Sequence, residues 1–516
     1  MHEPLFSNLP EQHDYRNPVV ELSPKRLARW LNELPVMNLC ACLDQVLEAL
    51  RPCNLQAMPD KNRMRLLGLY RDTFVLLFDA VDDEQLARQP ISSEQRQAAR
   101  SQAAALCAEL ASGYTILVRE CLRSDAPARQ PLLIPALYRA LEITAVGLLH
   151  SYRSYQPPPP FAYVQLHGLY AVAERTGIHQ APVTLERRSL AEDTIGAHYR
   201  QILMLAVSDP YRFGVGAAAR LFPLLAPYAP MCLLGPYGSA EAEAGCYVID
   251  RGADSAPTPA DRADAGRPFE DPLLLDIRPA LDGIAKALST SEGDTEHASL
   301  LQSLLPGSET KRVRQAPRRE VQREAWVTFG IAAVHHFLRG GPGPIAEAIR
   351  TAGAAFQVRD LDGDTDPEHE FEPWAVINES VSGYLLASRN QWLGEARVGD
   401  VVGVSLSNAS GQPRLTAAAV RWMRAARDRR VEMGVEIIPG TARPVRCSGD
   451  NSELVAALFF PSAPALQLAA TLVLPKGIYR PGAVVGVQTG ERMLQVRAGD
   501  IVSATDCFDR FDFEAV

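Results

Sequence analysis

The stretch WAVINESVSGYLLAS, residues 374–388, predicts a β-hairpin in which two apolar runs flank the polar, glycine-ended segment NESVSG at 378–383. Asn378 and Ser380 are typical turn residues, and Gly383 allows a backbone geometry that a residue with a Cβ resists. The same amide, hydroxyl and closely approachable backbone are also suited to recognising a small anionic ligand. The hairpin alone leaves both interpretations open.

Strand-like sequence surrounds this hairpin. These segments are apolar or alternating and are bounded by Gly, Asn, Asp and Pro. They are WVTFGIAAVHHF (326–337), DVVGVSLS (400–407), RLTAAAVRWMR (414–424), RVEMGVEII (430–438), LQLAATLVLP (466–475), AVVGVQTG (483–490), RMLQVRAGDIVSAT (492–505) and FDRFDFEAV (508–516). Several antiparallel strands at short spacing predict a small β-barrel over 311–445, and 446–516 is either a β extension or a degenerate second barrel.

The first part of the chain has a helical pattern instead. In SPKRLARWLNEL (23–34), Ser23 is a predicted N-cap, Pro24 takes the first helical position, and one stripe of the helix is apolar. Further helices are predicted at 38–51, 62–81, 93–123, 130–153, 160–176, 189–207 and 214–227. We therefore predict a multidomain α + β protein, with an all-α helical array over 1–250 and a linker with a connecting helix over 251–310.

Composition limits the function classes. At 516 residues the chain is long enough for about three domains, and 47% apolar with 22% charged residues is typical of a globular protein. The formal net charge of −9 argues against bulk binding to a nucleic acid polymer or an anionic membrane. The apolar stretch 132–150 is interrupted by Arg139 and Glu142, so we expect no membrane insertion. Nine cysteines without a C-x-x-C pair indicate reduced thiols, and a cytoplasmic location.

Several motif-like stretches lack the context that their chemistry needs. GVGAAA (214–219) follows helical sequence, so it is not expected to bind a dinucleotide. RDLDGDTD (359–366) lacks the Gly and Glu of a calcium loop. His335 and His336 are adjacent on a strand-like run, which would point them to opposite faces. We therefore expect no catalytic residue, no metal and no cofactor, and the protein is not predicted to be an enzyme.

The densest basic segment, KRVRQAPRREVQR at 311–323, directly precedes the first strand-like run. In a protein of net negative charge it is either a solvated linker or the one local anion site. Arg319 and Arg323 have the spacing R-x-x-x-R, which Arg314 and Arg318 repeat upstream. Guanidinium groups form bidentate hydrogen bonds with phosphate oxygens or with guanine O6 and N7, and they stack on bases.

Together these segments resemble the PilZ domain, a bacterial receptor for cyclic di-GMP. The resemblance rests on R-x-x-x-R in RREVQR (318–323), on [D/N]-x-S-x-x-G in NESVSG (378–383), and on RVEMGVEII (430–438), which is similar to the closing strand of that barrel. It covers roughly 311–442. The helical region is similar to that of uncharacterised bacterial proteins with a C-terminal PilZ-like domain.

The resemblance implies a role for each residue. Arg319 and Arg323 would bind guanine edges and phosphates. Asn378 would contact a guanine and Ser380 a phosphate, and Gly383 would allow the ligand to approach the backbone closely. The doubled spacing leaves the register open, with two further candidates: Arg318 and Arg314. One or two ligand molecules fit this set of arginines.

Two departures from the family pattern are visible. The stretch between Arg323 and Asn378 is longer than usual, because it holds RGGPGPIAEAIR (339–350) and the acidic loop at 359–366. The strands after residue 450 exceed a single barrel and show no second pair of motifs.

The resemblance predicts a bacterial cyclic di-GMP receptor that reorients its helical domain toward an unidentified protein partner when the ligand orders the arginine segment. The alternative is a ligand-free, PilZ-like adaptor that acts only through protein contacts. An enzyme of cyclic di-GMP turnover is disfavoured, because EAL at 48–50 lies in an amphipathic helical pattern without following metal ligands, and no GGDEF is present.

Overall fold

The computed structural model divides into two compact units. The first comprises Met1–Ser154, Pro158–Pro210 and Gly216–Lys311, and the second comprises Tyr155–Pro157, Tyr211–Val215 and Arg312–Val516. The structure describes residues 4–15, 19–35, 38–81, 93–123, 130–185, 188–238, 243–263, 269–290, 295–305, 317–340, 371–389, 396–406, 414–426, 430–448, 453–464, 467–489 and 492–516.

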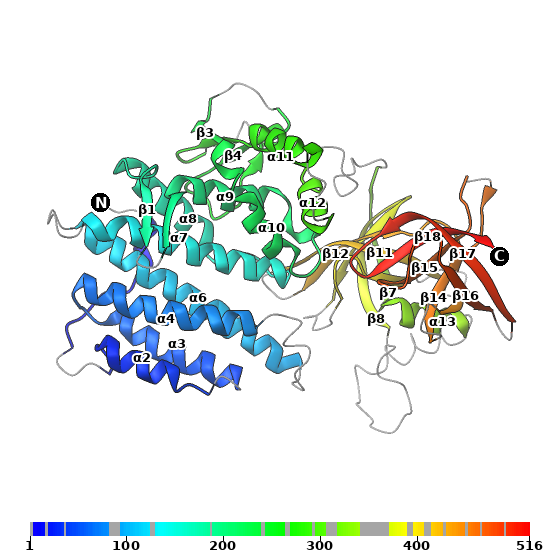
Figure 1. The fold of residues 1–516 in the computed structure, drawn as a ribbon, viewed down its shortest axis with the longest axis horizontal. Coiled ribbons are helices and arrows are strands. Elements are labelled where there is room, and N and C mark those ends of the chain that lie inside the picture. The colour runs from blue at the N-terminus through cyan, green and yellow to red at the C-terminus, as the bar shows by residue number, and fades with distance from the viewer. Residues whose placement is uncertain are drawn as a thin grey trace. The chain divides into compact units, whose positions relative to one another are not determined.

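The first unit is mainly helical, as the sequence predicts (Figure 1). Its long helices pack along one another, with α6 in contact with α3, α4 and α7. The helices are α1 (Pro4–Ser7), α2 (Pro24–Asn32), α3 (Leu39–Leu55), α4 (Asp60–Ala80), α6 (Ser93–Leu122), α7 (Gln130–Arg153), α8 (Ala162–Arg175), α9 (Ile195–Val207), α10 (Ala217–Leu225), α11 (Arg278–Thr290) and α12 (Thr295–Gln302), with 3₁₀ turns η1 (Pro210–Arg212), η2 (Ala229–Met231) and η3 (Ala260–Arg262).

Helix α7 is long and apolar enough to cross a membrane by length and composition. However, 56% of its apolar window is buried inside the structure, as in the core helix of a globular domain. Ion pairing allows Arg139 and Glu142 of this helix to be partly buried. Glu142 accepts from Arg139 at 2.7 Å and from Arg71 of α4 at 3.0 Å. Burial raises the pKa of Glu142, but the two arginines outweigh burial and hold it below its usual range.

Two small sheets lie in the region expected to be all-α and in the linker, and one of their strands falls in MCLLGPY (231–237), which has a strand-like pattern. β1 (Pro182–Leu185) pairs with β2 (Arg188–Thr194), which occupies residues that the sequence pattern assigned to the start of a helix. A four-stranded sheet has the order β3-β6-β4-β5. Its strands are β3 (Leu233–Pro236), β4 (Cys246–Ile249), β5 (Thr258–Pro259) and β6 (Leu273–Asp276). Residues 251–310 therefore contribute two strands to this sheet in addition to helices α11 and α12, so they are more than a linker.

The second unit contains two closed antiparallel barrels. The first has the order β10-β11-β12-β9-β8-β7 and the second the order β13-β14-β15-β18-β17-β16. Of the two alternatives for the C-terminal strands, the structure has the second barrel. The strands are β7 (Arg319–Phe329), β8 (Glu372–Ser380), β9 (Gly383–Ser388), β10 (Val401–Leu406), β11 (Leu415–Ala425), β12 (Val431–Ile437), β13 (Arg443–Ser448), β14 (Leu454–Phe460), β15 (Thr471–Pro475), β16 (Val484–Thr489), β17 (Arg492–Ala504) and β18 (Phe508–Ala515).

One expected strand is largely a helix. The run 326–337 continues β7 only as far as Phe329, and α13 (Ile331–Arg339) follows after Gly330. The strand argument about His335 and His336 was therefore wrong, because these residues are neighbours on a helix. Apolar residues dominated this run, so periodicity alone did not separate strand from helix.

Helix α13 packs on both barrels, contacting β7 and β10 of the first and β13 and β14 of the second. Phe337 of this helix lies 4.3 Å from Phe371, measured between ring centroids. Trp326 of the first barrel and Phe460 of the second belong to the same buried cluster. A common core therefore joins the two barrels.

Tyr155 belongs to the core of the first barrel although it comes from early in the chain. Its hydroxyl accepts from the Val398 amide at 3.1 Å and donates to the Phe213 carbonyl at 3.2 Å. Its own carbonyl accepts from the Ala425 amide at 2.6 Å. These bonds hold Tyr155 at a φ of 52°, which a non-glycine residue seldom adopts.

Candidate functional site

The NESVSG segment forms a tight hairpin, as predicted. β8 pairs with β9 from Trp374↔Ser388 to Ser380↔Gly383, which leaves Val381 and Ser382 as the turn. Val381 is 91% exposed, so the turn projects into solvent. The predicted hairpin is thus observed, with a turn of two residues.

Gly383 is required by close packing rather than by a left-handed backbone. A Cβ at this position would collide with the carbonyl oxygen of Val435 in the neighbouring strand β12. The backbone of β12 is also hydrogen-bonded to the turn, because the Ile437 amide donates to the Ser382 carbonyl at 2.8 Å. Gly383 therefore has a structural role in the barrel that is independent of any ligand.

Ser380 is held within the turn. Its Oγ and that of Ser382 lie 3.2 Å apart, and its hydroxyl lies 3.3 Å from the Gly383 carbonyl. Both contacts are long, and Ser380 is only partly buried. The hydroxyl can therefore turn from these partners toward a ligand.

A row of residues runs across the outer face of the first barrel. The strand register connects Glu320, Asn378, Leu385, Gly434 and Trp422 in this order. Gly434 has no room for a Cβ, because the Trp422 ring lies over it. The indole of Trp422 and the amide of Asn378 therefore lie on one face, with Leu385 and Gly434 between them.

The two arginines of the first register lie on strand β7, not on a mobile segment. Arg319 is opposite Glu379, and Arg323 is opposite Val376 after a bulge. Arg323 forms an ion pair with Glu379. Since adjacent strand residues point to opposite faces, Glu379 and its arginine partner lie on the other side of the sheet from Asn378.

The second register is placed differently. Arg318 directly precedes β7 and is exposed. Continuing the register of Arg319↔Glu379 by one residue sets Arg318 opposite Ser380. Ser380 and Asn378 share the outer face, and an extension of β7 by one residue would bring Arg318 to the same face. Arg314 lies outside the described residues.

Three residues of the first barrel, Arg421, Trp422 and Tyr384, were not singled out by the sequence patterns. Arg421, the bulged residue of β11, forms an ion pair with Glu436 at 2.7 Å, and Trp422 follows it. Tyr384 lies beside the Arg323–Glu379 pair. Burial and, to a smaller extent, the charge of Glu379 raise the pKa of Tyr384, and the charge of Arg323 opposes this shift. The sequence signal of Arg421 and Trp422 was the strand-like pattern of 414–424, and that of Tyr384 was the strand-like run 383–388; neither pattern identifies a partner.

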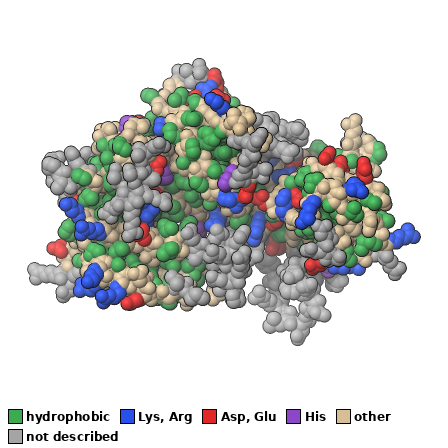
Figure 2. Space-filling view, viewed as in Figure 1, with side chains coloured by type: hydrophobic (Ala, Val, Ile, Leu, Met, Phe, Trp, Pro, Cys, Tyr) green, Lys and Arg blue, Asp and Glu red, His purple; other side chains and the backbone are tan. Residues whose placement is uncertain are grey.

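No cluster of three or more His, Cys, Asp or Glu residues suited to a metal ion occurs among the residues that the structure describes. On the face of the molecule shown in Figure 2, basic and acidic side chains are interspersed among apolar ones. This distribution agrees with a local anion site rather than a broad basic surface.

Three family models match the chain in succession. They are described as the N-terminal domain of the cyclic-di-GMP receptor FimW (residues 25–238), the middle PilZ domain of that receptor (346–444) and the FimW C-terminal β-barrel domain (440–516). The chain is also similar to the cyclic-di-GMP receptor FimW of Pseudomonas aeruginosa strain PAO1, with 22% identity over 96% of this chain and 91% of that protein. The resemblance to a PilZ domain is confirmed, and the chain matches in order the three domains described for FimW, which are an N-terminal domain, a middle PilZ domain and a C-terminal β-barrel domain.

Proposed function

We propose that this protein is a non-enzymatic receptor for cyclic di-GMP that binds the dinucleotide at the rim of the first barrel. The observation that carries the proposal is the match of the middle PilZ model to residues 346–444, which include the whole NESVSG hairpin. The relative named a cyclic-di-GMP receptor is similar over nearly the full chain. This similarity supports a receptor rather than an enzyme of nucleotide turnover.

We assign the binding residues from the NESVSG motif and from the outer face of the first barrel. Ser380 would contact a phosphate and Asn378 a guanine, with Gly383 keeping the backbone close to β12. A dianionic ligand needs charge-assisted donors. Arg318 is the arginine that we assign to this face, because it directly precedes β7 and an extension of the strand register by one residue would place it opposite Ser380. Arg323 would first have to leave Glu379.

The proposal extends to signalling. Ligand binding at the arginine segment would favour one arrangement of that segment, and the N-terminal helical unit would present a protein-binding surface in response. This relay requires the ligand to distinguish two states energetically. Proteolysis of the segment 305–325 that does not change on ligand addition would exclude the relay but not the binding.

The test is calorimetric titration of cyclic di-GMP into the full-length protein, with GTP as the control ligand. We expect a Kd in the micromolar range or tighter, equivalent to about 8 kcal/mol or more. Ser380→Ala, Asn378→Ala and Arg318→Ala should abolish or weaken binding. Arg443→Ala, which removes an exposed arginine from β13 of the second barrel, should not.

Absence of binding by the folded wild-type protein would refute the receptor proposal. The barrel would then be an adaptor module, the alternative that the sequence left open. The observed Arg323–Glu379 ion pair, which occupies one of the candidate arginines, is the feature that favours this alternative.

A further inference from the structure

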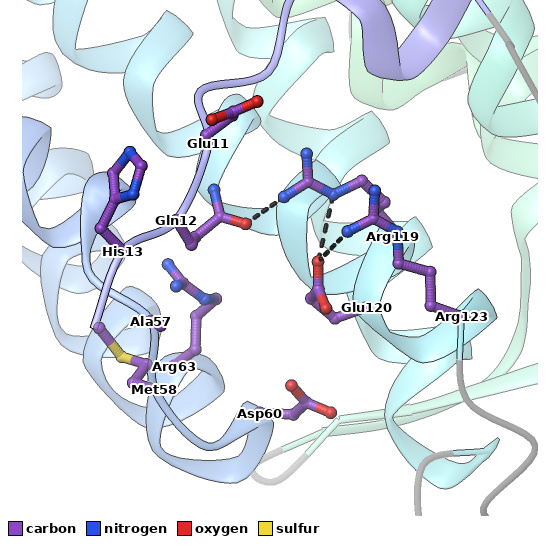
Figure 3. A pocket seen from close by; sticks show the side chains of 10 residues that line it. All are labelled: Glu11, Gln12, His13, Ala57, Met58, Asp60, Arg63, Arg119, Glu120 and Arg123. Carbon is purple, nitrogen blue, oxygen red and sulfur yellow. Dashed lines mark hydrogen bonds and ion pairs between the residues drawn. The ribbon is translucent and has the colours of Figure 1, made fainter.

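A second candidate site lies in the helical unit, away from the PilZ motifs in sequence. A cavity of about 470 Å³ is bounded by the segment 11–13, the start of α4 and the end of α6. Figure 3 shows the side chains of Arg63, Gln12 and Glu120 surrounding one open space, with Asp60 at its lower edge. Cavities of this size hold small ligands.

Arg63 is the most unusual residue of this cavity, because only 2% of its surface is exposed. Its guanidinium donates to the carbonyls of Cys53 at 3.3 Å and Gln56 at 2.7 Å, which terminate helix α3. These bonds explain part of its burial, since cations stabilise helix C-termini. They use two of its five N–H donors.

No carboxylate of a described residue lies within ion-pair distance of Arg63. Burial lowers its pKa, the nearby charges of Glu120 and Asp60 oppose the shift, and Arg119 adds to it. A buried charge without an ionic partner is costly, so such groups are normally paired. An anionic ligand in the cavity would supply the missing partner.

The other charges around the cavity largely neutralise one another. Glu120 Oε1 accepts from Arg119 Nε at 3.2 Å and from Arg123 Nη1 at 3.3 Å. Arg119 also donates to the Gln12 side chain. Arg63, Arg119 and Arg123 are balanced in number by Asp60, Glu120 and Glu11, of which Glu11 and Arg123 are exposed, so the lining carries no large excess of positive charge. This balance suits a monoanion better than a dianionic phosphate.

We propose that this cavity binds the carboxylate group of a polar ligand, with Arg63 as its main partner and Arg119 beside it. The planar guanidinium fork matches a carboxylate. The cavity exceeds the size of a carboxylate alone, so the ligand has a further polar body that meets Gln12 and His13. The carboxylate belongs either to a small organic acid or to the C-terminal residue of a peptide, since both offer the same chemistry.

Saturation-transfer NMR on the full-length protein tests this proposal. One arm uses acetylated dipeptides that cover every C-terminal residue type, each as the free acid and as the C-terminal amide. The other arm uses acetate, succinate and benzoate with their amides. Each probe is present at about 10 mM, which detects Kd values near 1 mM. We expect binding by free acids of one arm and not by the matched amides.

Variants locate the binding. Arg63→Gln should weaken it about tenfold or more, because a charge-assisted pair is lost. If this variant fails to fold, Ala57→Phe fills the cavity without removing a charge, and Arg119→Lys removes one guanidinium fork. Arg65→Gln, which removes an exposed arginine from the same helix, should bind normally.

Three results would overturn the proposal: no acid of either arm binds, the amides bind as well as the acids, or folded Ala57→Phe and Arg119→Lys bind normally. Displacement of the bound acid by cyclic di-GMP in the Ser380→Ala variant would also overturn it, because it would make the cavity a nucleotide site. The proposal does not depend on ligand binding by the barrel, so either can fail alone.

Discussion

Replacing Glu379 by Gln distinguishes between the two arginine registers. In the structure Arg323 is paired with Glu379, and their side chains are 40% and 24% exposed. If Arg323 contacts the dinucleotide, this pair must open before binding. The substitution removes that competing interaction and also removes one negative charge near a dianionic ligand. Affinity for cyclic di-GMP should therefore rise.

The magnitude follows from the exposure of the pair. Ion pairs at such partly exposed positions contribute up to about 1 kcal/mol. Release of about 0.5–1 kcal/mol corresponds to an affinity roughly two to five times higher, because 1.4 kcal/mol is a factor of ten. The gain should diminish at high salt, which already screens the pair.

Calorimetric titration of wild type and Glu379→Gln at low and high salt measures this effect. Glu432→Gln is the matched control, because it breaks a similar ion pair with Arg424 (3.0 Å) elsewhere on the same barrel. Its affinity should equal that of wild type. An unchanged or lower affinity in Glu379→Gln would refute a role for Arg323 and leave the register of Arg314 and Arg318.

Three further predictions concern stability. Gly383→Ala should destabilise the barrel by about 1–3 kcal/mol in denaturant unfolding, because its Cβ would meet the Val435 carbonyl; an unchanged midpoint would contradict the packing argument. Tyr155→Phe should cost about 1–3 kcal/mol by leaving the buried Val398 amide without its acceptor, whereas an unaltered melting temperature would show that this bond is dispensable. Burial lowers the pKa of His167 from its ordinary value of 6.5 to about 4, so the unfolded chain binds the extra proton first, and the free energy of unfolding should fall as pH drops from 6.5 toward 4. A His167→Gln variant should lose this part of the pH dependence, and an identical profile would exclude His167 as its source.

The hairpin and most strands were predictable because their signals are local. Alternating or apolar runs between turn residues define β8 to β12 and β15 to β18. The strands β13 (Arg443–Ser448) and β14 (Leu454–Phe460) were missed, and only long-range pairing closes the second barrel. Helix α13 was misassigned because its residues are apolar on the sides that face both barrels.

The sequence named candidate site residues, but it could not predict how they are arranged. Spacing identified R-x-x-x-R and NESVSG, yet spacing cannot reveal that a bulge in β7 sets Arg323 beside Glu379. Likewise, no local pattern connects Trp422 to Asn378, which belong to strands far apart in sequence. These relations arise from the register of four neighbouring strands.

The residues of the hairpin motif are not equally informative about ligand binding. Gly383 is demanded by the approach of β12, so a barrel that had lost its ligand would still need it. Asn378 and Ser380 differ. Within the part of the chain that the structure describes, Ser380 has only long contacts in its own turn, and the Asn378 side chain forms no hydrogen bond. A purely structural hairpin could replace either without a large loss of stability. Variants of Asn378 and Ser380 that fold normally are therefore the sharper probes of receptor function, whereas loss of binding in a Gly383 variant would report the integrity of the barrel.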